Sequence, residues 1–166
     1  MTTAGRILEP ALKSSPPAFT SDGVVREALA RYLAAVAEPL RSAGHRVSGP
    51  TLASPDERLG GSLSASASAS AANPALVVAS WNEETGWSTR DRPDQPSGAR
   101  RYLHQGLVPA PTLAAQFITA VIHSAAVTRA GGDTAVPGLA IADYPLQFRY
   151  RTGRAEHLLT QLSRAA

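Results

Sequence analysis

The fold is decided by one stretch of the chain, Leu76-Val77-Val78-Ala79-Ser80-Trp81-Asn82-Glu83-Glu84-Thr85-Gly86-Trp87-Ser88-Thr89-Arg90. An apolar run, a polar turn that ends in glycine and an alternating return predict a β-hairpin over about residues 75–90. Trp81 and Trp87 flank the five turn residues. We therefore expect the two indole rings to lie opposite each other on one face of a sheet, which Val77 and Ala79 share.

Upstream of the hairpin, the sequence predicts an amphipathic helix that begins after Ser21 or Asp22, either of which can cap it. Its apolar side chains recur at spacings of three and four residues: Val25, Leu29, Tyr32, Leu33, Val36 and Leu40. We expect Pro39 to kink or end this helix and Gly44 to close the segment.

The segment between this helix and the hairpin contains short strand patterns and a low-complexity run. Residues 46–48 and 51–53 have the composition of two short strands, which Gly49 and Pro50 interrupt. The run that follows alternates Ser and Ala, whose side chains are too small to gain much by burial. We therefore expect a flexible loop over residues 55–74.

Further elements are expected after the hairpin. Residues 100–104 have the pattern of a third strand, and a second helix is expected to begin at Pro111. Because this helix carries no charge as far as Thr128, it should be a buried central helix or a helix with a partner. Residues 146–151 alternate like a strand, and a short amphipathic helix follows. Its apolar residues recur at helical spacing: Ala155, Leu158, Leu159 and Leu162.

These elements predict an α+β fold of two layers. The order is a helix, a meander of three or four antiparallel strands and a second helix, followed by an extra C-terminal strand and short helix. We expect the domain to span residues 21–128, with a flexible tail at 1–20. We expect residues 129–166 to form a strand-helix extension that docks on its own domain or on a second subunit.

Composition excludes several kinds of chemistry. The 166 residues include no cysteine, so disulfides, thiolate catalysis, iron–sulfur clusters and Cys-based zinc sites are absent. Lys13 is the single lysine and lies in a Pro/Ser-rich tail, which argues against Schiff-base or P-loop chemistry. The net charge is +3, and no apolar run approaches the length of a signal peptide core or a membrane span. We expect a cytoplasmic protein without a cofactor or metal, and with no contact with a membrane.

The candidate binding residues are mostly aromatic or basic. The Trp pair either packs under a helix or forms an exposed platform that stacks a base, a sugar or a peptide side chain. Basic residues near the C-terminus form a stripe that can contact phosphates. The full set of candidate binding residues is Trp81, Trp87, Tyr102, His104, Arg149, Arg151 and Arg154. The candidate interface residues are Phe148, Leu158, Leu159 and Leu162.

Catalytic motifs are not found in the sequence, and no catalytic residue is assigned. No serine lies in Gly-x-Ser-x-Gly, and the histidines follow no zinc-like spacing. His104 is the one histidine we consider as a general base, with Glu83, Glu84 or Asp91 as a carboxylate partner. We expect the two glutamates to be solvated, since they lie at the tip of the turn.

Several blocks of the chain resemble a family of small actinobacterial proteins known only as a domain of unknown function. The blocks are Ala35-Val36-Ala37-Glu38, the hairpin at 75–88, Arg92-Pro93-Asp94, Tyr102-Leu103 and Leu107-Val108-Pro109-Ala110-Pro111. The resemblance covers about residues 22–128 and does not extend to the Ser/Ala run or to the segment after Arg129. It implies an intracellular accessory protein of an actinomycete and supplies no catalytic residue.

The sequence leaves three functions open. The first is a non-catalytic protein-binding or adaptor module that associates with itself, for example as a homodimer, and is accessory to a regulatory or biosynthetic system. The second is a nucleic-acid-associated regulator that uses the C-terminal arginines. The third is a small enzyme with a His/carboxylate site near the Trp hairpin.

Overall fold

The computed structural model describes residues 23–67, 76–91, 100–128, 138–148 and 154–166. Its elements follow in the order α1 (Gly23–Ser42), β1 (Arg46–Leu52), β2 (Gly60–Ser66), β3 (Leu76–Asn82), β4 (Gly86–Asp91), β5 (Arg100–Leu103), α2 (Pro111–Thr128), β6 (Ile141–Ala142) and α3 (Arg154–Ala165). The strands form one antiparallel sheet in sequence order, from β1 to β6. The predicted two-layer α+β fold is confirmed, but five strands, β1 to β5, precede α2 where a meander of three or four was predicted.

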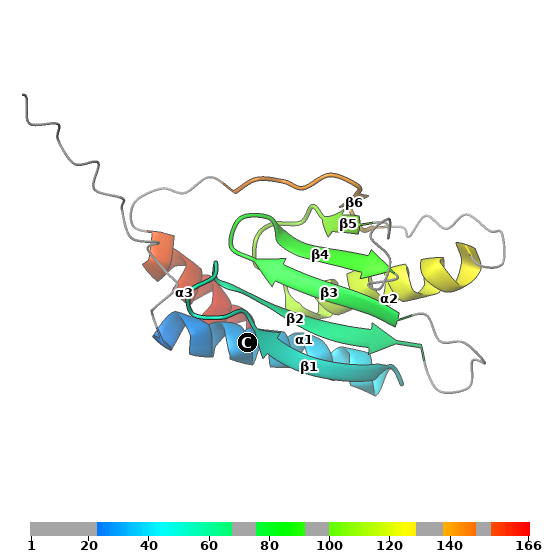
Figure 1. Ribbon diagram of the computed structural model, residues 1–166, viewed down its shortest axis with the longest axis horizontal. Helices are drawn as coiled ribbons and strands as arrows, with labels where there is room; N and C mark the ends of the chain where they lie inside the picture. The colour runs from blue at the N-terminus through cyan, green and yellow to red at the C-terminus, as the bar shows by residue number, and fades with distance from the viewer. Residues whose placement is uncertain (1–22, 68–75, 92–99, 129–137, 149–153) are drawn as a thin grey trace, which may run out of the picture.

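The helices pack on one face of the sheet. Helix α1 lies against β1 and β2, α2 lies against β2, β3 and β4, and α3 lies beside α1 (Figure 1). Alternation along β3 sends Val77, Ala79 and Trp81 to the helices, and all three side chains are buried. The opposite face of the sheet carries no helix among the described residues.

The Trp pair is the centre of the core. Trp81 is the register partner of Trp87, and the two side chains are 1% and 0% exposed. Trp81 Nε1 donates a hydrogen bond to the carbonyl of Leu107 at 2.6 Å, and Trp87 Nε1 donates to the Tyr32 hydroxyl at 2.9 Å. The predicted hairpin and facing rings are confirmed. The exposed aromatic platform is wrong, because both rings are covered by the helical layer.

The Tyr32 hydroxyl completes this buried network. It donates to the carbonyl of Pro109 at 2.8 Å while it accepts from Trp87. Burial raises the pKa of Tyr32 well above its ordinary value, so the hydroxyl keeps its proton and remains a donor. The network ties α1, the hairpin and the segment before α2 together.

Helix α1 does not end at Pro39. It runs on to Ser42, and Gly44, with a φ of 85°, closes it as predicted. Leu40, directly after the proline, is fully buried. Packing of the last turn therefore outweighs the one hydrogen bond that proline cannot donate.

The predicted flexible loop is wrong over residues 60–66, which form strand β2. Leu63 and Ala65 are buried, and the backbone pairs with β1 and β3 along its length. A Cβ at Gly61 would lie 2.5 Å from Leu33 Cδ1 of α1. Small residues in β2 thus let α1 approach the sheet closely. Residues 68–74 of the predicted loop lie outside the described residues.

Strand β1 is continuous where two short strands were predicted. It includes Gly49 and Pro50, which are joined by a cis peptide bond, and its register against β2 shifts between Ser48 and Thr51. An irregularity of this kind is a β-bulge, which interrupts the pairing without ending the strand.

The C-terminal strand lies earlier than predicted. The two residues Ile141 and Ala142 form β6 beside β5, whereas residues 146–148 are not a strand. After β6 the chain runs along the sheet to the β3–β4 turn, where the Phe148 N–H donates to the carbonyl of Glu84 at 2.8 Å (Figure 1). This tertiary hydrogen bond takes the place of strand pairing. Residues 149–151 of the predicted strand, and the predicted tail at 1–20, lie outside the described residues.

The short C-terminal helix is confirmed as α3. Leu158 and Leu162 are 3% and 0% exposed, and both belong to the hydrophobic core. The extension therefore docks on its own domain. Within the part of the chain that the structure describes, no helix has the length and apolar character needed to cross a membrane.

Candidate functional site

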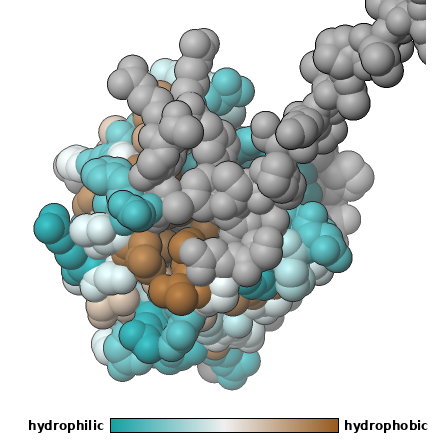
Figure 2. Space-filling model, turned by 90° about the vertical axis from the view of Figure 1, so that its left-hand side faces the viewer, coloured by the Kyte–Doolittle hydropathy of each residue, from teal (hydrophilic) through white to brown (hydrophobic). Residues whose placement is uncertain are grey.

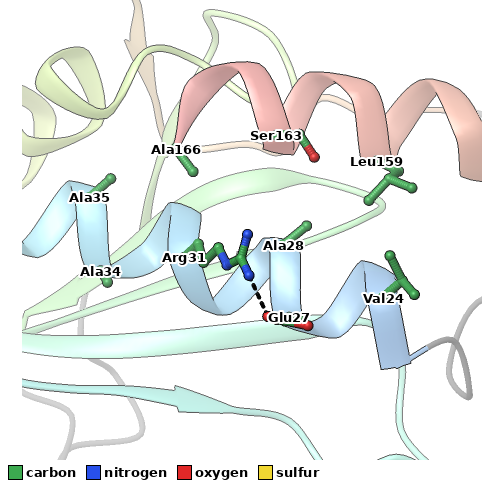
Figure 3. Close-up of a pocket in the computed structure, with 9 residues that line it drawn as sticks. All are labelled: Val24, Glu27, Ala28, Arg31, Ala34, Ala35, Leu159, Ser163 and Ala166. Atoms are coloured by element: carbon green, nitrogen blue, oxygen red, sulfur yellow. Dashed lines mark hydrogen bonds and ion pairs between the residues drawn. The ribbon is translucent and has the colours of Figure 1, made fainter.

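A groove between α1 and α3 is the candidate functional site. The two helices run side by side and parallel, and their facing side chains leave a cavity of about 690 Å³ (Figure 3). Its lining comes from both helices: Val24, Glu27, Ala28, Arg31, Ala34, Ala35, Leu159, Ser163 and Ala166.

The groove follows from the helical periodicity of the two segments. On α1, the stripe that includes Leu29 and Leu33 packs on the sheet, so the residues at 24, 27, 31 and 34 lie on another face. On α3, Leu158 and Leu162 are buried, whereas Leu159 is half-buried at the edge of the groove. Three of the six α1 residues in this lining are alanines, which leaves room for side chains from outside.

The groove is lined by one acidic and one basic residue, Glu27 and Arg31. Arg31 Nη2 lies 2.5 Å from Glu27 Oε1, one helical turn away, and the two side chains are 71% and 64% exposed. Val24, at the start of the same face, is 60% exposed. Figure 2 views the end of the molecule where α1 begins and shows a compact apolar patch bordered by hydrophilic and grey atoms.

A second cavity, of about 770 Å³, lies where β1 turns into β2 and β3 turns into β4. Its lining is mostly polar: Thr51, Leu52, Ala53, Asp56, Glu57, Arg58, Gly60, Gly61, Ser62, Ser80, Trp81, Asn82 and Glu84. Arg58 forms an ion pair with Glu84, and Asn82 Oδ1 accepts the N–H groups of Glu84 and Thr85. These polar groups hold the turns together.

The two turn glutamates differ in environment. Glu84 is partly exposed and paired with Arg58, but Glu83 is 6% exposed, so the prediction of a solvated Glu83 is wrong. The Glu83 N–H donates to the carbonyl of Leu59, which draws this part of the turn against the β1–β2 connection. Glu83 Oε2 has no hydrogen-bond partner among the described residues.

Within the described ranges, His104 forms no hydrogen bond or ion pair with a carboxylate. Its Nε2 lies 2.7 Å from the carbonyl oxygen of Tyr144, to which it donates, and its ring meets the Tyr144 ring edge-on at 4.9 Å. His104 lines neither of the two cavities. The segment after β6 therefore uses this ring as an anchor, and His104 has no carboxylate partner for general-base catalysis among the residues that the structure describes.

The other predicted binding residues are dispersed. Tyr102 is half-buried on the helix-free face of the sheet, opposite Ser88. Arg149 and Arg151 lie outside the described residues, as does the side chain of Arg154, the first residue of α3.

The predicted interface residues divide between the core and the groove. Leu158 and Leu162 are covered by the chain's own core, so they are not available to a partner, and half-buried Phe148 packs against the same core. Leu159 lines the groove. The amphipathic stripe of α3 was predicted, but its partner is helix α1, which is more than a hundred residues away in the sequence.

The structure brings together two histidines, His45 and His123, whose proximity the sequence does not predict. The rings of His45 and His123 lie 6.1 Å apart, and His45 Nε2 lies 3.4 Å from Thr119 Oγ1. Burial, together with the nearby His123, lowers the pKa of His45. The two residues share no local motif, since they meet only when α2 packs beside α1. No group of three or more potential metal ligands occurs among the residues that the structure describes.

Comparison of the chain with models of protein families, with curated proteins and with solved structures found no match.

Proposed function

We propose that this protein is a non-catalytic protein-binding module that forms a homodimer through the α1–α3 groove. The observation that carries the proposal is a groove with small side chains along α1 and an exposed acid and base one helical turn apart.

The charge pattern favours a second copy as the partner. In a twofold interface, residue i of one protomer contacts residue j of the other, and residue j contacts residue i. Antiparallel packing of two α1 helices would place Glu27 of each protomer against Arg31 of its partner. The face of α1 that carries Glu27 and Arg31 is thus complementary to itself.

The shape of the groove supports the same partner. Exposed Ala34 and half-buried Ala35 let a second helix approach α1 closely, because they extend only one carbon from the backbone. Val24 is largely exposed, and half-buried Leu159 lies on the facing helix. Covering these side chains removes apolar surface from water, which favours association by roughly 25 cal/mol per Å².

Charge reversal on α1 tests the proposal. In Glu27→Arg, two arginines face each other across both halves of the twofold interface, so the dimer should weaken about tenfold or more. Arg31→Glu should weaken it similarly. Sedimentation equilibrium at micromolar concentrations measures the dissociation constant for each variant.

The matched control is Glu38→Arg. Glu38 forms an ion pair with Arg41 on the same helix, is 73% exposed and does not line the groove. Its reversal should leave the dissociation constant within about twofold of the unmodified value. A protein that is monomeric throughout this range, or one that Glu38→Arg weakens as much, contradicts the proposal.

A further inference from the structure

The helix-free face of the sheet carries two arginines in direct opposition. Arg90 of β4 is the register partner of Arg100 of β5, two residues along each strand from the pair Ser88 and Tyr102. Side chains two residues apart on a strand point to the same face. Ser88 is buried and its hydroxyl donates to the carbonyl of Ser80, so two cations and a phenol are left on one patch, which we call the arginine patch (Arg90, Arg100 and Tyr102).

The two charges of this patch have no neutralising acid in the part of the chain that the structure describes. Neither arginine forms an ion pair with a carboxylate among the described residues. Arg90 Nε is buried and has no hydrogen-bond partner there. Like charges that lie directly opposite in a sheet destabilise it, and so does a buried donor without an acceptor. Counting the described residues alone, the patch is thus short of both negative charge and acceptor atoms.

We propose that the arginine patch binds a dianionic oxyanion of the phosphate monoester class. Two guanidinium groups match two negative charges, and their N–H groups fit the oxygens of a phosphate in bidentate fashion. The Tyr102 hydroxyl, beside them on the same face, supplies a further donor. The patch lies on the other side of the sheet from the α1–α3 groove, so this inference stands apart from the proposed dimer.

Titration with phosphate tests the assignment. Inorganic phosphate and phenyl phosphate are added at fixed ionic strength, and amide shifts of β4 and β5 are followed by NMR. We expect saturable binding that weakens about tenfold in Arg90→Gln and in Arg100→Gln. Arg100 is exposed, so its variant retains the fold even where Arg90→Gln does not.

Arg101→Gln is the matched control. Arg101 is next to Arg100 on the same strand, is also exposed, and belongs to the opposite face by alternation. We expect its phosphate affinity to stay within about twofold of the unmodified protein. An equal loss in Arg101→Gln, or the lack of saturable shifts in the unmodified protein, would overturn the proposal.

Two further ligands identify the source of the phosphate group. A phosphoserine peptide that binds more tightly than inorganic phosphate supports a phosphate carried by a protein, and equal binding supports a small phosphorylated molecule. Preferential binding of a mixed-sequence oligonucleotide at physiological salt, lost in both arginine variants, would overturn the monoester assignment in favour of nucleic acid.

Discussion

The Tyr32 hydroxyl lies between two groups that have no access to water. It donates to the Pro109 carbonyl and accepts from Trp87 Nε1. Tyr32→Phe should lower the free energy of unfolding by about 2 kcal/mol, since it leaves a buried carbonyl and a buried N–H without partners. Urea denaturation followed by tryptophan fluorescence measures this loss.

Tyr102→Phe is the control for that measurement. Tyr102 is half-buried on the helix-free face of the sheet, and its loss of a hydroxyl should cost less than about 0.5 kcal/mol. Equal costs for the two variants would show that the buried network does not stabilise the fold.

His45 should make stability depend on pH. Its pKa is lowered in the folded protein by burial and by the nearby His123, from an ordinary value of 6.5. The unfolded chain therefore takes up this proton first as the pH falls, which favours unfolding below about pH 6.5. The free energy of unfolding should decrease from pH 7.5 to pH 5.5.

The variant His45→Gln separates the pH dependence of stability that is due to His45 from the part that is due to the titration of carboxylates. Its loss of stability over the same pH range should be smaller than that of the unmodified protein, as measured by urea denaturation at each pH. Identical pH dependence in the two proteins would contradict the role assigned to His45.

At the scale of elements, β2 owes its packing to residues with little or no side chain. A Cβ at Gly61 would lie 2.5 Å from Leu33 Cδ1 and 3.0 Å from the carbonyl of Thr51. Gly61→Ala should therefore lower the free energy of unfolding by about 1–3 kcal/mol through overpacking. Thermal or urea denaturation gives the value.

The comparison variant is Gly23→Ala, where a Cβ meets nothing within 4 Å. Alanine reduces the entropy of the unfolded chain relative to glycine, so this variant should be neutral or slightly more stable. Stabilisation by Gly61→Ala would show that β2 does not pack closely against α1.

Strand β2, compared with the Trp hairpin and the long helices, shows which elements can be predicted from sequence patterns and which cannot. The Trp hairpin and both long helices could be predicted, because large apolar side chains recur at the period of a strand or a helix. Strand β2 could not, since its burial comes from the absence of bulk, which resembles low complexity. Likewise, the stripe on α3 predicts an apolar face, but only the folded chain shows that this face docks on α1 and creates the groove.

At the scale of the whole molecule, two leucines of α3 that lie about one helical turn apart, Leu159 and Leu162, have different roles. Leu162 is fully buried in the core, whereas half-buried Leu159 lines the groove. Leu162→Ala should lower the free energy of unfolding by about 2–5 kcal/mol, the usual cost of such a cavity.

Leu159→Ala should cost less stability and should weaken the dimer instead, because it removes apolar surface from the groove. Urea denaturation and sedimentation on the two variants distinguish these effects. A dimer weakened only by Leu162→Ala would contradict the placement of the interface.

The central claim is that two copies of the chain meet through self-complementary α1–α3 grooves. Its most direct test is to mix Glu27→Arg with Arg31→Glu and to measure the mass of the mixture by sedimentation. One variant then carries two arginines at these positions and the other two glutamates, so each pairs poorly with itself and well with the other. The account predicts that the mixture forms dimers at concentrations where each variant alone is monomeric. A mixture no more associated than its separate components would contradict it.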